Sequence, residues 1–138
     1  MDIRKITDDF SVSPQIGVAD APVIAAAGFR TVICNRPDGE SADQPASADV
    51  AAAVKAAGME WRMLPVTQLS RSDVDAFGKL LAELPKPVLA FCRSGTRCTT
   101  LWSLTEVDKR PVEDILARTR AAGYDMSALM QRAAGPRS

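Results

Sequence analysis

Apolar residues along the 138-residue chain fall in short runs separated by Gly, Pro and polar turns, a pattern that predicts alternating strands and helices. The wholly apolar run Val88–Phe91 is typical of a central parallel strand, and the β-branched residues of Thr31–Asn35 predict a second buried strand. Alternation predicts two further strands, one at Glu60–Val66 and one at Phe10–Ser13, where Pro14 ends the strand and favours a sheet edge.

Helices are expected between these strands, where apolar residues recur every three or four positions and capping residues precede them. They are predicted over Ala21–Ala27, over Ala48–Ala57 with Ser47 as its cap, from a cap at Ser70 or Ser72 up to Pro85, after Arg97, from Pro111 to Gly123, and over Ser127–Ala134. The repeated strand–helix order implies parallel strands joined by right-handed crossovers. We therefore expect one α/β domain over residues 1–138, with a four- or five-stranded, mainly parallel sheet flanked by helices.

Composition narrows the function classes. Lys and Arg number 17 and Asp and Glu also 17, which gives no nucleic-acid footprint and no basic patch for a membrane surface. No apolar run approaches the roughly 20 residues that span a bilayer, and the first nine residues have no signal-peptide core. We expect a cytoplasmic protein without nucleic-acid or membrane partners.

The chain has no histidine, which excludes an internal Ser-His-Asp triad and a His-rich metal site. Its three cysteines, Cys34, Cys92 and Cys98, are odd in number and have no CxxC spacing, so we expect neither a disulfide scaffold nor a metal site. Cys34 lies within an apolar strand and is predicted to be a core residue.

The segment that follows the central strand carries the candidate chemistry. Cys92 stands at the strand's end and begins the loop Cys92-Arg93-Ser94-Gly95-Thr96-Arg97 before a helix. Backbone N–H groups in such a loop can form an anion-binding nest, to which the helix N-terminus adds positive potential and Arg97 a planar fork. The same setting lowers a thiol pKa from about 8.5 toward 3.5–7.5, so Cys92 is the expected nucleophile.

A second loop, Arg36 to Glu40, follows the neighbouring predicted strand. Because open α/β sheets bind ligands at the carboxyl ends of their strands, the two loops are expected to lie side by side. Arg36 is then a candidate anion ligand, and Asp38 a candidate to orient an arginine or move a proton. A tight turn closed by a surface salt bridge is the alternative interpretation, and the sequence leaves both open.

The Cys92–Arg97 loop resembles the active loop of rhodanese-type sulfurtransferases, and also the phosphate loop of cysteine-dependent tyrosine phosphatases with one residue missing. A wider pattern, formed by residues 8–16, 28–40, 64–66 and 88–97, resembles the β-lactamase-hydrolase-like (DUF442) family over roughly residues 5 to 107. This resemblance implies a tyrosine-phosphatase-like fold, an association with sulfur transfer, and a persulfide dioxygenase or sulfide-oxidising enzyme as partner.

The loop length favours sulfur transfer over phosphate chemistry. Six residues from Cys92 to Arg97 match the rhodanese loop, whereas the resemblance gives phosphatases seven and a larger cradle. Phe91 stands where phosphatases usually have His, and the stretch Val66–Ser70 lacks the acid that protonates a leaving oxygen. We therefore expect a rhodanese-like sulfurtransferase that carries a Cys92 persulfide, uses Arg97 with Cys92, and needs no cofactor.

Two other functions stay open at this stage: a cysteine-dependent phosphatase for phosphotyrosine or a small phosphate ester, and a non-catalytic redox- or anion-sensing module that docks on a sulfur-oxidising enzyme. The substrate is expected to be a small sulfur-containing or anionic molecule, held by Arg93, Ser94, Gly95, Thr96, Arg36 and Asp38. Cys98 stands where relatives usually have Ser or Thr, and it is either a small core residue or a resolving thiol for Cys92.

Overall fold

The computed structural model describes residues 1–134 of the chain. Its strands are β1 (Arg4–Thr7), β2 (Phe10–Ser13), β3 (Thr31–Cys34), β4 (Glu60–Met63) and β5 (Val88–Phe91). Its helices are the short 3-10 helix η1 (Val18–Asp20), α1 (Ala21–Ala26), α2 (Ser47–Ala56), α3 (Arg71–Glu83), α4 (Thr96–Glu106), α5 (Val112–Ala121) and α6 (Ser127–Ala134).

The five strands form one sheet in the order β1-β2-β5-β3-β4, and only the β1–β2 pair is antiparallel. The expected mainly parallel α/β sheet is therefore confirmed. The edge position expected for Phe10–Ser13 is wrong, because β1 pairs with its outer side. The fourth strand also ends earlier than expected, at Met63.

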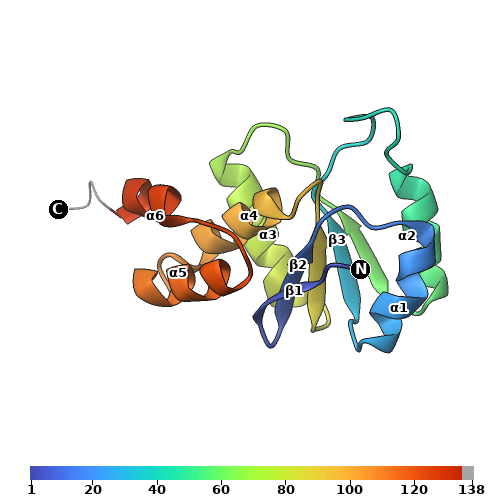
Figure 1. Cartoon of the computed structure of the whole chain (residues 1–138), viewed down its shortest axis with the longest axis horizontal. Helices are drawn as coiled ribbons and strands as arrows, with labels where there is room; N and C mark the ends of the chain where they lie inside the picture. Colours follow the sequence, from blue (N-terminus) through green and yellow to red (C-terminus); the bar gives the residue numbers. More distant parts are fainter. Residues whose placement is uncertain (135–138) are drawn as a thin grey trace.

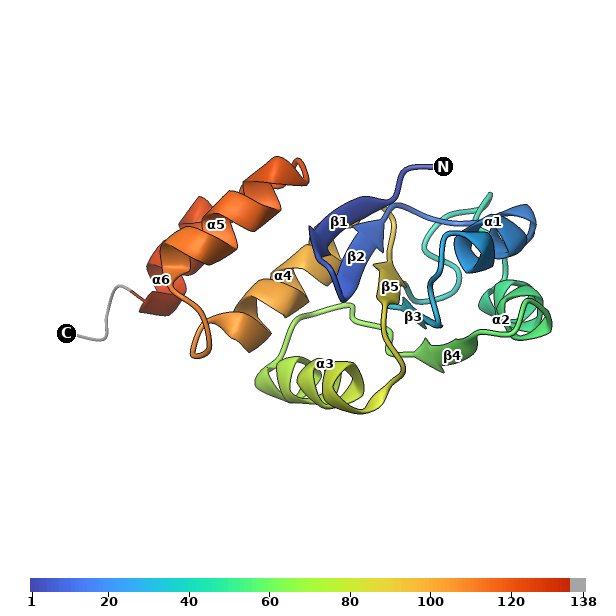
Figure 2. The same cartoon turned by 90° about the horizontal axis from the view of Figure 1, so that it is seen from below.

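Helices cover both faces of the sheet. Figures 1 and 2 show α1 and α2 on one face, α3 and α4 on the other, and α5 and α6 on the outer side of α4. The apolar run of β5 serves both layers: Val88 and Ala90 pack with the core on the α3–α4 face, and Leu89 and Phe91 with the core on the α1–α2 face. This two-sided burial is why the central strand has no polar residue.

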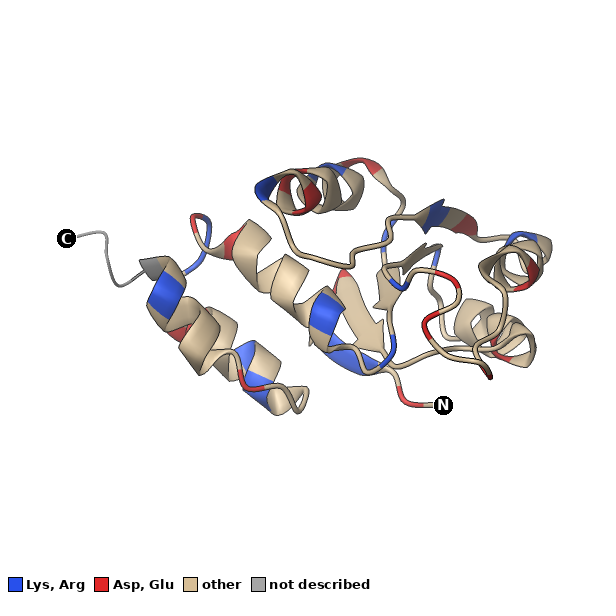
Figure 3. Ribbon diagram, turned by 90° about the horizontal axis from the view of Figure 1, so that it is seen from above, with Lys and Arg blue, Asp and Glu red and all other residues tan. Residues whose placement is uncertain are grey.

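Basic and acidic residues are interspersed along the helices and loops of the molecule (Figure 3). Among the helices of residues 1–134, none combines the length and the apolar character that crossing a membrane requires.

Candidate active site

Three parallel strands end at the same level and place their following loops together. Ser13 of β2 and Cys34 of β3 both pair with Phe91, the last residue of β5. Backbone hydrogen bonds continue past the strands: the N–H of Asn35 donates to the carbonyl of Phe91 at 2.9 Å, and the N–H of Gln15 donates to that of Arg93 at 3.3 Å. The loop after Cys34 and the loop that begins at Cys92 are therefore neighbours, as the strand order required.

The Cys92 loop curls around the cysteine sulfur. Gly95 has a φ of 91° at the N-terminal cap of α4, and its N–H donates to Cys92 Sγ at 3.1 Å. A Cβ at this position would collide with the Tyr124 side chain, so both the backbone conformation and the space require glycine. The Tyr124 hydroxyl, from the segment between α5 and α6, donates to the Ser94 carbonyl at 2.9 Å and braces the loop from outside.

Cys92 is held as a thiolate at neutral pH. A hydrogen bond from the Cys98 thiol, followed by those from the backbone N–H groups of Cys98, Gly95 and Ser94, lowers the pKa of Cys92 to about 5, although burial acts in the opposite direction. The side chain is only 1% exposed, so the thiolate is shielded from bulk solvent. A buried, hydrogen-bonded thiolate of this kind is a nucleophile at pH 7.

The other two cysteines differ from Cys92 in state. Burial raises the pKa of Cys98 well above its ordinary value, so Cys98 keeps its proton and acts as a donor to Cys92. Burial also raises the pKa of Cys34 to about 11, and Cys34 lies in the core on the α1–α2 face, as predicted. All three cysteines are free of disulfide bonds, and a resolving role for Cys98 stays a prediction.

Arg97, in the first turn of α4, turns toward the loop that follows β3 rather than lying open above the thiolate. Its Nη1 donates to the carbonyl of Val66 at 2.9 Å and to that of Asn35 at 3.2 Å. Its Nη2 lies 3.1 Å from one carboxylate oxygen of Glu40 and donates to the other at 3.3 Å. Arg97 thus clamps three neighbouring loops together beside Cys92.

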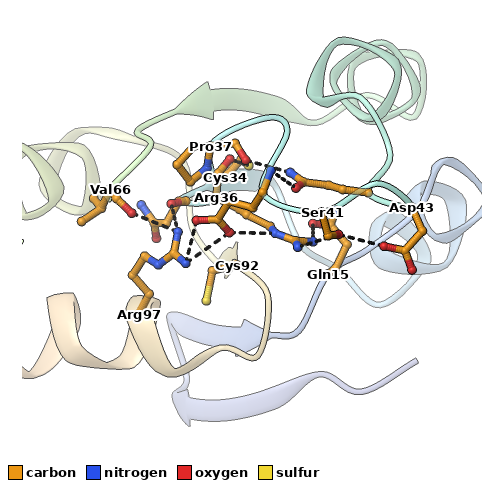
Figure 4. A network of polar contacts seen from close by, with 12 residues as sticks. Gln15, Cys34, Arg36, Pro37, Ser41, Asp43, Val66, Cys92 and Arg97 are labelled. Atoms are coloured by element: carbon orange, nitrogen blue, oxygen red, sulfur yellow. Dashed lines mark hydrogen bonds and ion pairs between the residues drawn. The ribbon is translucent and has the colours of Figure 1, made fainter. Parts of the chain in front are cut away.

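Arg36 enters the same network from the loop that follows β3. Its Nε donates to Glu40 Oε1 at 3.0 Å, its Nη1 to Gln15 Oε1 at 2.9 Å and its Nη2 to Ser41 Oγ at 3.2 Å. The side chain of Arg36 is 5% exposed. Figure 4 shows Arg36 and Arg97 in one network of polar contacts near Cys92, with the Arg36 side chain extending toward Gln15 and Ser41. One carboxylate therefore bridges two arginines at the predicted anion site.

Asp38 lies outside the network that Arg36 and Glu40 form. Its carboxylate accepts hydrogen bonds from the Ser47 N–H at 2.7 Å and the Ser47 hydroxyl at 2.6 Å, and these bonds lower the pKa of Asp38. Ser47 is therefore the first residue of α2 and not its cap, and Asp38 caps that helix from a distance. The arginine-orienting contact considered for Asp38 is made by Glu40 instead.

The remaining predicted ligands line the outside of the loop. The Ser94 hydroxyl donates to Thr96 Oγ1 at 3.0 Å, and both residues are exposed, Ser94 in the loop and Thr96 at the start of α4. Arg93 is exposed and interacts electrostatically with Asp43. The structure brings Arg93, Ser94, Gly95, Thr96 and Arg97 around Cys92, and Arg36 beside them.

Sequence reasoning missed Glu40, Gln15 and Tyr124. Glu40 follows the Pro37-Asp38-Gly39 turn, and its ion pair with Arg97 is visible in the folded structure but not in the sequence. Tyr124 follows the helix stop Gly123 and carries no motif. Among residues 1–134, no group of three or more His, Cys, Asp and Glu side chains is arranged to hold a metal ion.

Comparison with known proteins places this architecture. Solved structures with the same arrangement include a phosphatase candidate from Neisseria meningitidis, with 38% identity, 99% coverage of both chains and a TM-score of 0.87. The Pseudomonas aeruginosa protein TpbA in complex with phosphotyrosine aligns over 99% of this chain and 84% of its own, with a TM-score of 0.66. At 14% identity, this match shows a similar fold and nothing further. The expected tyrosine-phosphatase-like fold is confirmed by these neighbours.

Sequence comparison gives the family. A beta-lactamase hydrolase-like protein from Agrobacterium fabrum is 34% identical over 131 residues, which are 90% of this chain and 30% of that protein. The chain thus spans about a third of the length of this relative. The sequence profile described as "Beta-lactamase hydrolase-like protein, phosphatase-like domain" matches residues 2–109. The chain therefore belongs to the family of phosphatase-like domains of beta-lactamase hydrolase-like proteins, as the resemblance of its motifs had indicated.

Proposed function

We propose that this chain is a cysteine-dependent sulfurtransferase that carries sulfane sulfur on Cys92. The observation that carries the proposal is the lowered pKa of Cys92, which makes it a thiolate at the start of a six-residue loop. Glu40, the carboxylate that contacts Arg97, is engaged in ion pairs with Arg36 and Arg97 rather than left free as a proton donor for a leaving oxygen. Sulfur transfer needs none, since sulfite and thiolates leave as anions.

The reaction is a pair of displacements at sulfur. Cys92 thiolate attacks the outer sulfur of a donor such as thiosulfate; the new S–S bond forms as the donor's S–S bond breaks, and sulfite leaves with the electron pair. A thiolate or cyanide then attacks the outer sulfur of the Cys92 persulfide, and Cys92 leaves as the thiolate. The N–H of Gly95, which contacts the sulfur at 3.1 Å, is suited to stabilise the anion at each stage.

The burial of Cys92 is compatible with a small transferred group. Cys92 is 1% exposed, and one added sulfur atom occupies less space on it than a phosphoryl group with three oxygens.

A second candidate, a cysteine-dependent phosphatase, is favoured by the comparisons rather than by the site. The family description and the name of the 38% identical Neisseria protein both refer to phosphatases, and they back this activity better than sulfur transfer. In this reaction Cys92 attacks phosphorus, the S–P bond forms as the P–O ester bond breaks, and the leaving oxygen takes a proton from water.

The experiment that separates the two follows both activities on the same protein samples. Thiocyanate formation from thiosulfate and cyanide, with glutathione persulfide as a second donor, measures sulfur transfer, and p-nitrophenyl phosphate hydrolysis measures phosphatase activity. We expect sulfur transfer that is lost in Cys92→Ser and kept in the control Glu60→Gln, since Glu60 is a surface residue at the start of β4, at the opposite end of the sheet.

Phosphate release that depends on Cys92, without sulfur transfer, would reject the main proposal in favour of the phosphatase. Absence of both activities would favour a non-catalytic redox- or anion-sensing module. A sulfur-oxidising enzyme as partner stays a prediction, and co-purification with a persulfide dioxygenase would test it.

A further inference from the structure

One carboxylate forms ion pairs with the two arginines that would otherwise bind the anionic part of a substrate. Glu40 contacts Arg36 at 3.0 Å and Arg97 at 3.1 Å, and its side chain is 27% exposed. These two contacts join a residue of the β3 loop to the last residue of the Cys92 loop. Other N–H groups of Arg36 donate to Gln15 and Ser41, and others of Arg97 donate to backbone carbonyls.

We propose that Glu40 sets the charge that the site accepts, so that donors with one negative charge react in preference to dianions. The proposal rests on the sulfur transfer proposed above for the identity of the donors, but its effect on anion binding does not. Glu40 acts as a specificity-determining residue because its carboxylate already occupies the place of a substrate anion and pairs with both arginines.

The charges around the loop support this inference. The site contains three arginines and three acidic groups: Arg36, Arg93 and Arg97, with Glu40, Asp43 and ionised Cys92. The two signs balance, so a dianion entering the site meets no excess positive charge, and it also meets Glu40 directly. Removal of the Glu40 charge would leave one net positive charge next to Cys92 and free donor groups on two guanidinium ions.

Two donors of similar shape differ by one charge and can measure this selection. Thiosulfate, a dianion, transfers its outer sulfur and leaves as sulfite; methanethiosulfonate, a monoanion, transfers its outer sulfur and leaves as methanesulfinate. In each case Cys92 thiolate gains one sulfur, and the electron pair of the broken S–S bond leaves with the oxidised sulfur. The ratio of interest is kcat/KM for thiosulfate divided by kcat/KM for methanethiosulfonate. We expect Glu40→Gln to raise this ratio by about tenfold or more.

A matched control is available at the other end of the sheet. Glu60 begins β4, pairs with Arg62 at the surface and is 53% exposed, so Glu60→Gln changes the net charge equally without touching the site. This variant is expected to keep the wild-type ratio. An equal shift in both variants, or none in Glu40→Gln, would overturn the proposal.

A binding measurement tests the same idea without any turnover. Sulfate, a dianion, should slow the alkylation of Cys92 by the neutral reagent iodoacetamide. Mass spectrometry of the Cys92 peptide measures the rate of this alkylation. We expect Glu40→Gln to lower the half-protecting sulfate concentration at least tenfold and Glu60→Gln to change it less than twofold. This result in a protein that transfers no sulfur would reject the proposed function but keep the role of Glu40.

A further variant separates charge from shape. Glu40→Asp keeps the negative charge, so in this variant sulfate should protect Cys92 from alkylation at the same concentration as in the wild type. If sulfate protects Glu40→Asp as strongly as it protects Glu40→Gln, the charge of Glu40 is not the cause and the proposal is wrong. Because Glu40→Asp retains a carboxylate, this comparison also serves if Glu40→Gln folds poorly.

Discussion

The reactivity of Cys92 is decided by hydrogen bonds from a few atoms around its sulfur. The thiol of Cys98 makes the largest contribution to the lowered pKa of Cys92, ahead of the backbone N–H groups. Cys98 can do this because its own burial keeps it protonated. A pair of thiols thus divides into a nucleophile and a donor by position alone, without a histidine or a lysine base.

We predict that the rate of Cys92 alkylation by iodoacetamide is half-maximal near pH 5 and constant above about pH 6, because the thiolate is the reactive form and the pKa of Cys92 is about 5. In Cys98→Ala the midpoint should move to higher pH, since a bond that favours the thiolate is lost. Cys98→Ser retains a donor and should move less. An unchanged midpoint in Cys98→Ala would contradict the assigned cause.

At the scale of elements, short strands and one positive-φ glycine position the loop. The apolar β5 and the β-branched β3 were predictable because two-sided burial leaves no place for polar residues. β1 was missed because Arg4-Lys5-Ile6-Thr7 has a single apolar residue, and only its pairing with β2 makes it a strand. The Cys92 loop was predictable from local sequence, whereas Glu40 was not, since its partner Arg97 lies 57 residues away.

We predict that Gly95→Ala destabilises the protein more than Gly28→Ala. Both glycines have positive φ, 91° and 99°, which costs an alanine about 1–2 kcal/mol. A Cβ at Gly28 meets nothing within 4 Å, whereas one at Gly95 collides with Tyr124, so Gly95→Ala should cost about 1–3 kcal/mol more. Urea unfolding of the two variants measures the difference, and equal losses would show that the loop yields to the added methyl group.

Asp38→Ala should reduce stability and leave the alkylation rate of Cys92 unchanged, because its carboxylate caps α2 through Ser47. Ser47→Ala removes only the hydroxyl contact and should cost less. Unfolding in urea and iodoacetamide kinetics provide the two measurements. A slower alkylation at unchanged stability would restore a role for Asp38 in the chemistry.

At the scale of the whole molecule, the last helices hold the site although the family profile ends at residue 109. Tyr124 braces Ser94, and Met126 and Met130 complete the core on the α3–α4 face. The first strand also contacts this region: Arg4 donates to the Ala122 carbonyl at 3.3 Å and lies 5.0 Å from the Tyr124 ring centroid. These contacts could not be predicted, because no local pattern couples residues more than 110 positions apart.

Tyr124→Phe is predicted to lower stability by about 1 kcal/mol and to raise the pH midpoint of Cys92 alkylation, because Ser94 loses its brace and the N–H donors near Cys92 are less fixed. The matched control is Thr31→Val, which removes a hydroxyl that donates to the Pro85 carbonyl at 2.7 Å, at the opposite end of the sheet. This control should lose similar stability and keep the midpoint. A shared shift would show that the midpoint follows global stability.

The contact between Tyr124 and the Cys92 loop has a consequence during synthesis. A ribosome makes the nucleophile 32 residues before the tyrosine that braces its loop, an interval on the order of a few seconds at roughly 5–20 residues per second. Throughout that interval the emerging Cys92 lacks its folded surroundings and is an ordinary thiol, mostly protonated at neutral pH. The strong nucleophile therefore arises only after the segment that follows α5 has been made.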